Sequence, residues 1–372
     1  MSDWKIRFGT AGTSDSFAAQ GYKSSLDVPE YTAKMGLNAF EYQCGRGVRL
    51  GLDKAAKMAA LAGPKDILFS VHAPYYISMS SLEEDKRLNS IQYLLQSAAV
   101  CRALGGRRII FHSGSCGKQS REAALEKALD TMRRAVEALD EAGFADMTLC
   151  PETMGKIGQL GTLDEVLALC AVDSRITPCI DFGHLNARTL GGIRSKEDYA
   201  AILDRMAEKL GDQRAERFHV HFSRIEYSAG GEKRHWTFAE TQFGPEPQPL
   251  MELLAQRKLQ PVIICESAGT QAEDTQTMMR MYKEHCDGRA VRELSSRTAT
   301  GCGTQHPLRY RLRLAGRCPN SFSLFSAAGS GRRCCKTPVP PRRLRAGAPP
   351  PGHSLEKLPA ALPVKGPMLS DL

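Results

Sequence analysis

The sequence predicts an α/β fold, a (β/α)8 TIM barrel, followed by a disordered, basic and proline-rich C-terminal tail. Three observations favour the barrel: short apolar runs of strand length recur along the chain, helical patterns separate them, and most runs end in His, Asp or Glu. Strands that are apolar throughout and separated by helices indicate a parallel sheet covered by helices. Eight such units favour a closed barrel over an open sheet.

The expected strands are residues 5–10, 38–44, 67–73, 107–113, 147–152, 176–182, 217–223 and 261–266. Three of the intervening helices are expected to open with a capping box, in which a hydroxyl residue and a Glu three positions later bond each other's backbone N–H. These pairs are Ser81–Glu84, Thr162–Glu165 and Thr270–Glu273. Helix ends are expected at Gly105 and Gly143, because glycine readily adopts the left-handed conformation that follows a helix.

Charge divides the 372 residues into two expected domains, a catalytic barrel at 1–286 and a tail at 287–372. The tail holds 15 Lys and Arg against 4 Asp and Glu, and 11 of the 20 prolines, whereas residues 1–286 hold 35 against 37. This composition predicts a disordered segment, or sequence that continues past a natural end near Cys286. A basic arm that binds nucleic acid is the functional alternative.

Cysteine usage and hydropathy predict a cytoplasmic protein. Eight of the 12 cysteines lie scattered in or beside apolar runs of residues 1–286, as expected of reduced, buried thiols. The N-terminal residues lack the apolar stretch of a signal peptide, and no run approaches the roughly 18 apolar residues of a membrane span. We therefore expect a protein that does not bind membranes. We also expect it to be a monomer.

Side chains that bind divalent metals are expected at the carboxyl ends of the strands, where a β/α barrel places its active site. Neutral imidazoles and carboxylates are ligands of zinc and manganese, and a bridging carboxylate can hold two ions about 3.5–4 Å apart. Burying several carboxylates together without cations would be costly. The candidate ligands are His72, His112, Glu152, Asp181, His184, His221, His235 and Glu266. His219 is expected to be a core histidine that does not bind metal.

At these residues the sequence resembles the endonuclease IV family of zinc-dependent apurinic/apyrimidinic endonucleases (AP endonuclease family 2), within the xylose isomerase-like barrels. The resemblance spans residues 4–285. Its carriers are Val71–His72–Ala–Pro–Tyr75, Phe111–His112–Ser–Gly–Ser115, Pro151–Glu152–Thr, Asp181–Phe–Gly–His184, His221–Phe–Ser, Arg234–His235 and Cys265–Glu266–Ser. Each motif is short, and their combination is what makes the resemblance specific.

The resemblance implies hydrolysis of the phosphodiester 5′ to an abasic site in DNA repair, by zinc ions that share one catalytic, bridging carboxylate. The first implied ligand set is His72, His112 and Glu152, and the second is Glu152, Asp181, His221 and Glu266. Tyr75 and Arg46 are implied to contact the DNA.

A third implied ion would be held by His184 and His235, with an Asp two residues before the second histidine. Lys233 occupies that position, and a cation cannot replace an anionic ligand. Either Glu232 turns into the site, or the centre has two ions. Zinc is the expected metal, with manganese as the alternative.

Two other functions fit the same residues. A sugar isomerase or epimerase of the same superfamily would use one divalent ion, held by Glu152, Asp181, His221 and Glu266. A catalytically inert metal-binding protein is the third reading. The additional histidines at 72, 112 and 235 favour the endonuclease, because the single-ion quartet does not need them. Cationic residues in the loops after the strands would suit a phosphate backbone.

Overall fold

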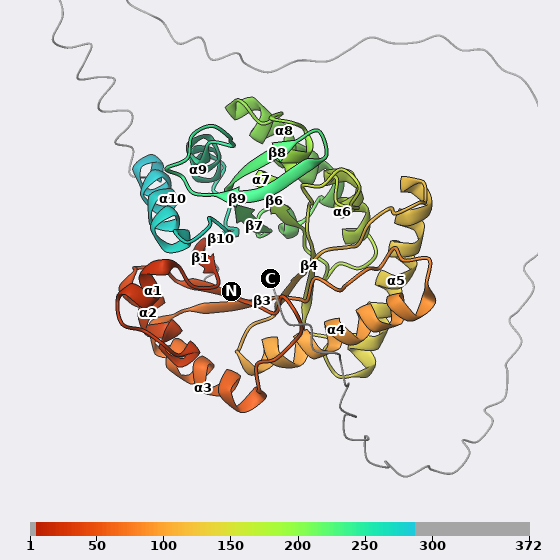
Figure 1. Ribbon diagram of the computed structural model, residues 1–372, viewed down its shortest axis with the longest axis horizontal. Helices are drawn as coiled ribbons and strands as arrows, with labels where there is room; N and C mark the ends of the chain where they lie inside the picture. The colour runs from red at the N-terminus through yellow and green to blue at the C-terminus, as the bar shows by residue number, and fades with distance from the viewer. Residues whose placement is uncertain (1–4, 287–372) are drawn as a thin grey trace, which may run out of the picture. The chain divides into compact units, whose positions relative to one another are not determined.

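The computed structural model describes residues 5–286, in which eight parallel strands form one barrel surrounded by helices (Figure 1). The barrel strands are β1 (Arg7–Ala11), β2 (Ala39–Gln43), β3 (Leu68–His72), β4 (Arg108–Phe111), β5 (Thr148–Pro151), β6 (Cys179–Asp181), β7 (His219–Phe222) and β10 (Val262–Cys265). Each of these eight strands lies beside the one before it and the one after it in this list, and β10 returns to pair with β1.

The barrel closes between β5 and β6. Glu152 and Cys179 form a parallel bridge there, Thr177 N donates to Leu149 O at 3.0 Å, and Thr153 N donates to Cys179 O at 3.0 Å. The other seven junctions are regular parallel ladders. The predicted eight-stranded α/β barrel is therefore confirmed.

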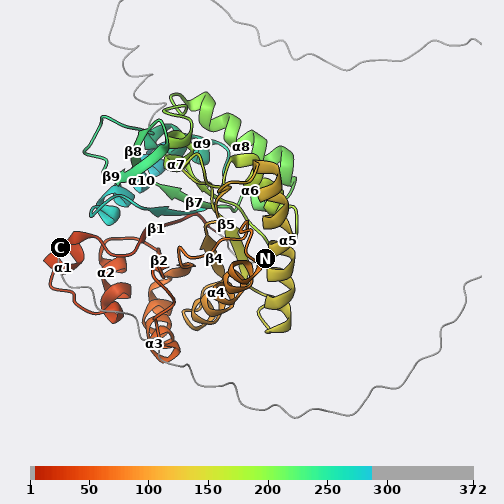
Figure 2. The same cartoon turned by 45° about the vertical axis from the view of Figure 1, so that its right-hand side comes forward.

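Helices connect successive strands and cover the outside of the barrel (Figures 1 and 2). They are α1 (Asp15–Ala19), α2 (Val28–Lys34), α3 (Leu52–Ala62), α4 (Glu84–Ala103), α5 (Arg121–Glu141), α6 (Leu163–Cys170), α7 (Phe182–Arg188), α8 (Lys196–Leu210), α9 (Pro247–Gln256) and α10 (Gln271–Cys286), with short 3-10 turns at Ser25–Asp27, Gly63–Lys65 and Gln213–Ala215. Two clusters of buried apolar side chains fill the space between strands and helices, one around Phe69 and Ile109 and the other around Val220 and Ile263.

Some helix boundaries follow the sequence-based expectation. Thr162 Oγ1 accepts the N–H of Glu165, whose carboxylate in turn accepts the N–H of Thr162, so the predicted capping box opens α6. Gly105 and Gly143 lie just beyond the ends of α4 and α5 with φ of +74° and +78°. Glycine is favoured at both places because a Cβ would be strained in this left-handed backbone.

The other two expected capping boxes are not formed. Ser81 lies in a turn, its hydroxyl accepts the N–H two residues on, and α4 begins only at Glu84. Thr270 directly precedes α10, but its hydroxyl donates to the Asp274 carboxylate at 2.9 Å and does not cap Glu273. In both places the hydroxyl has a nearer polar partner than the helical N–H, a competition that the spacing of residues does not reveal.

A β-hairpin that we did not predict follows β7. Its strands β8 (Arg224–Ser228) and β9 (Gly231–Trp236) pair antiparallel as a separate two-stranded sheet. The hairpin lies outside the barrel strands and over α7 (Figure 1). Only Ser223 separates β8 from β7, so the apolar run at 217–223 gave no sign that a second sheet begins there.

The expectation of buried thiols is confirmed within the described residues, where seven of the eight cysteines are buried and all eight are free. None of the described helices is both long and apolar enough to span a bilayer. The tail at 287–372, with its four cysteines, lies outside the described residues.

Candidate metal centre

All of the predicted ligands lie at the carboxyl end of the barrel. His72 ends β3, His112 and Glu152 directly follow β4 and β5, Asp181 ends β6, His221 lies in β7, Glu266 follows β10, His184 lies on α7 and His235 on β9. Above them is a cavity of about 510 Å³, lined by His72, His112, His184, His235 and Glu266 among others. The parallel strands bring these side chains together because their carboxyl ends meet at one face of the barrel.

Glu152 lies at the centre of the group and is 1% exposed. Its Oε2 is 3.2 Å from the Nε2 atoms of both His72 and His112. Its Oε1 is 3.1 Å from the Nδ1 atoms of both His184 and His221. Each carboxylate oxygen therefore faces its own pair of imidazoles, which is the arrangement required of a ligand that bridges two ions.

Two of the implied ligand sets are assembled around Glu152. The donor atoms of His72, His112 and Glu152 all lie within 4.8 Å of one another, as do those of Glu152, Asp181, His221 and Glu266. Asp181 Oδ1 accepts the N–H of His184 at 2.6 Å, whereas Asp181 Oδ2 is buried and makes no hydrogen bond among the described residues. The nearest nitrogen to Asp181 Oδ2 is His184 Nδ1 at 3.2 Å, and a buried carboxylate oxygen that is not fully hydrogen-bonded is suited to a cation.

A third set consists of His184, Glu232 and His235, whose donor atoms also lie within 4.8 Å of one another. Glu232 Oε2 is 3.4 Å from His184 Nε2, and His235 Nδ1 is 2.8 Å from Ser223 Oγ. Gly155 leaves room for this carboxylate, since a Cβ at that position would lie 2.6 Å from Glu232 Cβ. Glu232 thus provides the carboxylate that the sequence lacks at position 233.

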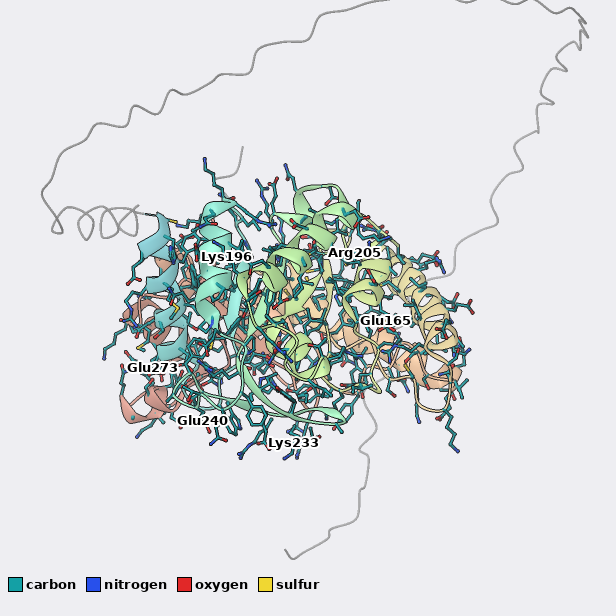
Figure 3. The ribbon with its side chains drawn as sticks, turned by 90° about the horizontal axis from the view of Figure 1, so that it is seen from above. Glu165, Lys196, Arg205, Lys233, Glu240 and Glu273 are labelled. Carbon is teal, nitrogen blue, oxygen red and sulfur yellow. The ribbon has the colours of Figure 1, made fainter. Side chains whose placement is uncertain are left out.

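A β-bulge explains why Glu232, and not Lys233, faces the site. Strand β9 pairs with β8 on either side of Lys233, which has no opposite residue of its own. In a regular strand His235 and Lys233 would share a face. The extra residue reverses the alternation, so His235 and Glu232 share a face instead. Lys233 forms an ion pair with Glu226 and lies at the outer edge of the molecule (Figure 3).

The buried carboxylates of the centre need positive charge nearby to neutralise them. Burial alone would raise the pKa of Glu152, but His221 and the other imidazoles hold it well below 4.5. Burial lowers the pKa of both His184 and His221, but neighbouring groups outweigh it and raise both pKa values well above 6.5. For His184 the largest of these is Asp181, and for His221 they are Cys179, Glu266 and Glu41. Burial raises the pKa of Asp181 to about 6. Protons on imidazoles thus balance the carboxylates where no ion is bound, and metal ions would take over that task.

Beneath the ligands lies a carboxylate that the sequence analysis missed. Glu41 sits in the middle of β2, is completely buried, and reaches His219 Nε2 and His221 Nε2 at 3.0 Å each. Burial lowers the pKa of His219 to about 4, so this imidazole is neutral. The donor atoms of His219, His221 and Cys179 also lie within 4.8 Å of one another, so the expectation that His219 does not bind metal stays a prediction. The signal for Glu41 was a charged residue inside an otherwise apolar and aromatic strand.

The two residues that were expected to contact DNA lie in the loops after β2 and β3, and Tyr75 lines the cavity. Tyr75 is 58% exposed, and its ring centroid lies 5.4 Å from that of His112. Arg46 is exposed in the loop after β2, and Tyr75 N donates to the carbonyl of the adjacent Gly45 at 3.1 Å. The loops after β2 and β3 therefore contact each other through the main chain next to Arg46.

The cationic residues of the loops divide into two groups. Arg121, Arg188 and Arg224 anchor loops by donating to main-chain carbonyl oxygens. Four others are exposed, and their side chains form no hydrogen bond or ion pair within residues 5–286: Arg46, Arg49, Lys118 and Lys156. The side chains of the second group have no partner among the described residues, and Lys156 lines the cavity itself.

Comparison with known proteins gives one family and two kinds of relative. The model of the xylose isomerase-like TIM barrel family matches residues 29–285. An uncharacterized protein of Methanocaldococcus jannaschii is 35% identical over 277 residues, which cover 74% of this chain and 97% of that protein. A probable endonuclease 4 of Mycoplasma pneumoniae is 28% identical over 203 residues, which cover 52% of this chain and 65% of that enzyme.

Solved structures of two functional classes share the fold. A D-tagatose 3-epimerase-like protein aligns with a TM-score of 0.57 and 17% identity, over 77% of this chain and 100% of that one. Endonuclease IV from Thermus thermophilus aligns with a TM-score of 0.55 and 20% identity, over 76% of this chain and 99% of that one. At such identities the likeness is evidence of the fold alone.

Proposed function

The chain is an enzyme of the xylose isomerase-like TIM barrel family, and we propose that it is a zinc-dependent endonuclease that cleaves DNA 5′ to abasic sites. The observation that carries this proposal is that the Nε2 atoms of His72 and His112 both lie 3.2 Å from the Oε2 atom of Glu152. They form a ligand set beyond the quartet that a single-ion enzyme would use. The set of His184, Glu232 and His235 adds a further one.

The donors fit zinc better than magnesium or calcium, because imidazole nitrogens are present in all three sets. When bound, zinc ions would supply an activated water at neutral pH and positive charge for the oxygens of a phosphodiester in displacement. The protein's own part is to hold the ligands rigidly and to keep them buried. Glu152 has the central role, because its two oxygens belong to different sets.

The surroundings of the centre support a nucleic-acid substrate. Tyr75 exposes an aromatic face beside the ligands, where it can stack on a base or fill the gap left by a missing one. Lys156 lines the same cavity, and Arg46 and Lys118 are exposed in the loops after β2 and β4, so their charge is available to phosphates. The relative from Mycoplasma pneumoniae, named a probable endonuclease 4, supports the same substrate class.

The second candidate is a sugar isomerase or epimerase. The quartet of Glu152, Asp181, His221 and Glu266 is complete and can hold one divalent ion without the other two sets. In that function His72 and His112 would only line the pocket. The two candidates therefore differ in the number of ions that the protein needs.

The experiment that tests the proposal replaces His112 by alanine in the full chain. Bound zinc is counted, cleavage of a duplex with one tetrahydrofuran abasic analogue is assayed, and ketose epimerisation is assayed beside it. We expect the zinc content to fall by one ion and cleavage to fall by at least about a hundredfold. His285→Ala, which changes a histidine at the end of α10 outside the ligand sets, is the matched control. A parent protein that holds one ion, does not cleave and epimerises a ketose would overturn the assignment.

A further inference from the structure

Glu41 is a buried charge that the proposed chemistry leaves unexplained. It lies in the centre of β2, which pairs with β1 and β3, and its carboxylate is completely buried beneath the metal centre. Burying a carboxylate is costly unless its oxygens are compensated. The groups that contact each oxygen of Glu41 therefore indicate its role.

Each oxygen of Glu41 has one imidazole and one neutral donor. Oε1 lies 3.0 Å from His221 Nε2 and accepts from Gln43 Nε2 at 3.1 Å. Oε2 lies 3.0 Å from His219 Nε2 and accepts from Ser70 Oγ at 2.9 Å. The two imidazole N–H directions are not aligned with the carboxylate as the side chains now stand, so these contacts are close pairs rather than formed hydrogen bonds.

His221 is consequently contacted by carboxylates on both ring nitrogens. Its Nδ1 faces Glu152 at 3.1 Å and Glu266 at 3.5 Å, on the side of the ligand set. Its Nε2 faces Glu41, on the side of the barrel interior. A metal-binding histidine donates its other N–H to a carboxylate or carbonyl, and this partner fixes the tautomer and the orientation of the ring.

We propose that Glu41 is a positioning residue, which holds the proton of His221 on Nε2 and thereby leaves the Nδ1 lone pair directed at a divalent ion. His221 Nε2 is already within hydrogen-bonding distance of Oε1, at 3.0 Å, and the hydrogen bond forms when the ring turns its N–H toward that oxygen. The negative charge of Glu41 also lies directly behind the ligand, where it strengthens the attraction of the imidazole for a cation. The second oxygen of Glu41 lies against His219 and accepts from Ser70 Oγ, so it has no part in orienting His221.

This inference requires only that the ligand sets bind metal. It does not depend on whether the substrate is abasic DNA or a sugar, so the two proposals can fail separately. The test accordingly measures metal binding and uses no substrate.

The experiment compares Glu41→Gln with the parent in the full chain. Zn²⁺ affinity is measured by competition with a chromophoric chelator, and the visible absorption of the Co²⁺-loaded proteins reports the coordination of the ion. We expect one class of zinc site to weaken by roughly 10–100-fold, with a changed Co²⁺ spectrum, and the remaining sites to keep their affinity. Replacing a residue that is needed only for folding would not weaken zinc binding at one site and leave the other sites unchanged.

Two further variants decide between positioning and packing. Ser70→Ala removes a donor from the opposite oxygen of Glu41 but leaves the carboxylate against His221, so it should bind zinc like the parent. Glu41→Asp keeps the charge and withdraws it by one methylene, so its affinity should fall between the two, and it replaces Glu41→Gln if that variant does not fold. Parent-like affinity and spectrum in the Glu41 variants would overturn the proposal, as would an equal loss in Ser70→Ala.

Discussion

Glu152 joins the halves of the metal centre through its two oxygens. Oε2 faces His72 and His112, whereas Oε1 faces His184 and His221. An amide of the same shape would leave the packing of this buried side chain nearly unchanged. It would, however, remove the charge that both ligand sets share.

We therefore predict that Glu152→Gln loses zinc and at least about a hundredfold of its cleavage activity while it remains folded. The measurements are metal content, circular dichroism and cleavage of the abasic duplex. Turnover at the parent rate by a folded Glu152→Gln protein would exclude a bridged, dinuclear mechanism.

The shifted pKa values of His184 and His221 predict how stability depends on pH. Both are raised well above 6.5 in the folded protein. Their contribution to the stability of the metal-free protein is therefore fully present below pH 6.5 and is lost as the pH rises through the folded values. Zinc replaces these protons, so it should stabilise the protein more at pH 8.5 than at pH 6.

This dependence can be measured as the shift in unfolding midpoint between protein in EDTA and protein in zinc, at both pH values. Zinc addition should also release protons, which a pH indicator detects in weakly buffered solution. An equal or larger zinc shift at pH 6 would contradict the assigned role of these imidazoles.

At the residue scale, the sequence indicated the candidate ligands, most of them at strand ends, and missed the contacts that depend on finer geometry. His72 and Glu152 could be predicted because an apolar run shows where its strand ends. Glu41 was missed, because its charge within an apolar strand is a signal that does not tell whether the side chain faces the interior. The direction of Glu232 depends on a bulge, which leaves no signal in the spacing of residues.

At the scale of elements, hairpin β8–β9 completes the centre from outside the barrel. Its bulge at Lys233 turns Glu232 and His235 to the same face, and Gly155 on the neighbouring loop makes room for the carboxylate. The eight strands were predicted because buried parallel strands produce apolar runs separated by helices. The hairpin was not, because its strands are short, charged and half-exposed, as loops are.

Adjacent positions in β9 provide a matched pair of variants. We predict that Glu232→Gln lowers the zinc content by one ion and weakens cleavage, because it removes the only carboxylate among the described residues of the third set. Lys233→Gln should keep the zinc content of the parent, since this side chain pairs with Glu226 away from the centre. The measurement is zinc per protein after exhaustive dialysis. Equal zinc loss in both variants would instead indicate a general disturbance of the hairpin.

At the scale of the whole molecule, the metal centre depends on the closure of the barrel. The ligands come from six strands or the loops that directly follow them, from α7 and from the hairpin, so each set joins segments far apart in the chain. Closure between β5 and β6 brings Glu152 next to Asp181. All of these segments lie between Arg7 and the end of α10 at Cys286.

We therefore predict that truncation after Cys286 leaves the unfolding midpoint and the zinc content unchanged. The eight strands pair with one another within residues 7–265, and α10 covers β1 and β10 from within residues 271–286. The 15 Lys and Arg beyond Cys286 can still matter for binding. If they contact phosphates, the truncated protein will show weaker DNA affinity and a shallower dependence of that affinity on salt, with the same site of cleavage. Calorimetry, metal analysis and binding at several salt concentrations check these outcomes, and a marked fall in the unfolding midpoint would show that the segment after Cys286 stabilises the barrel.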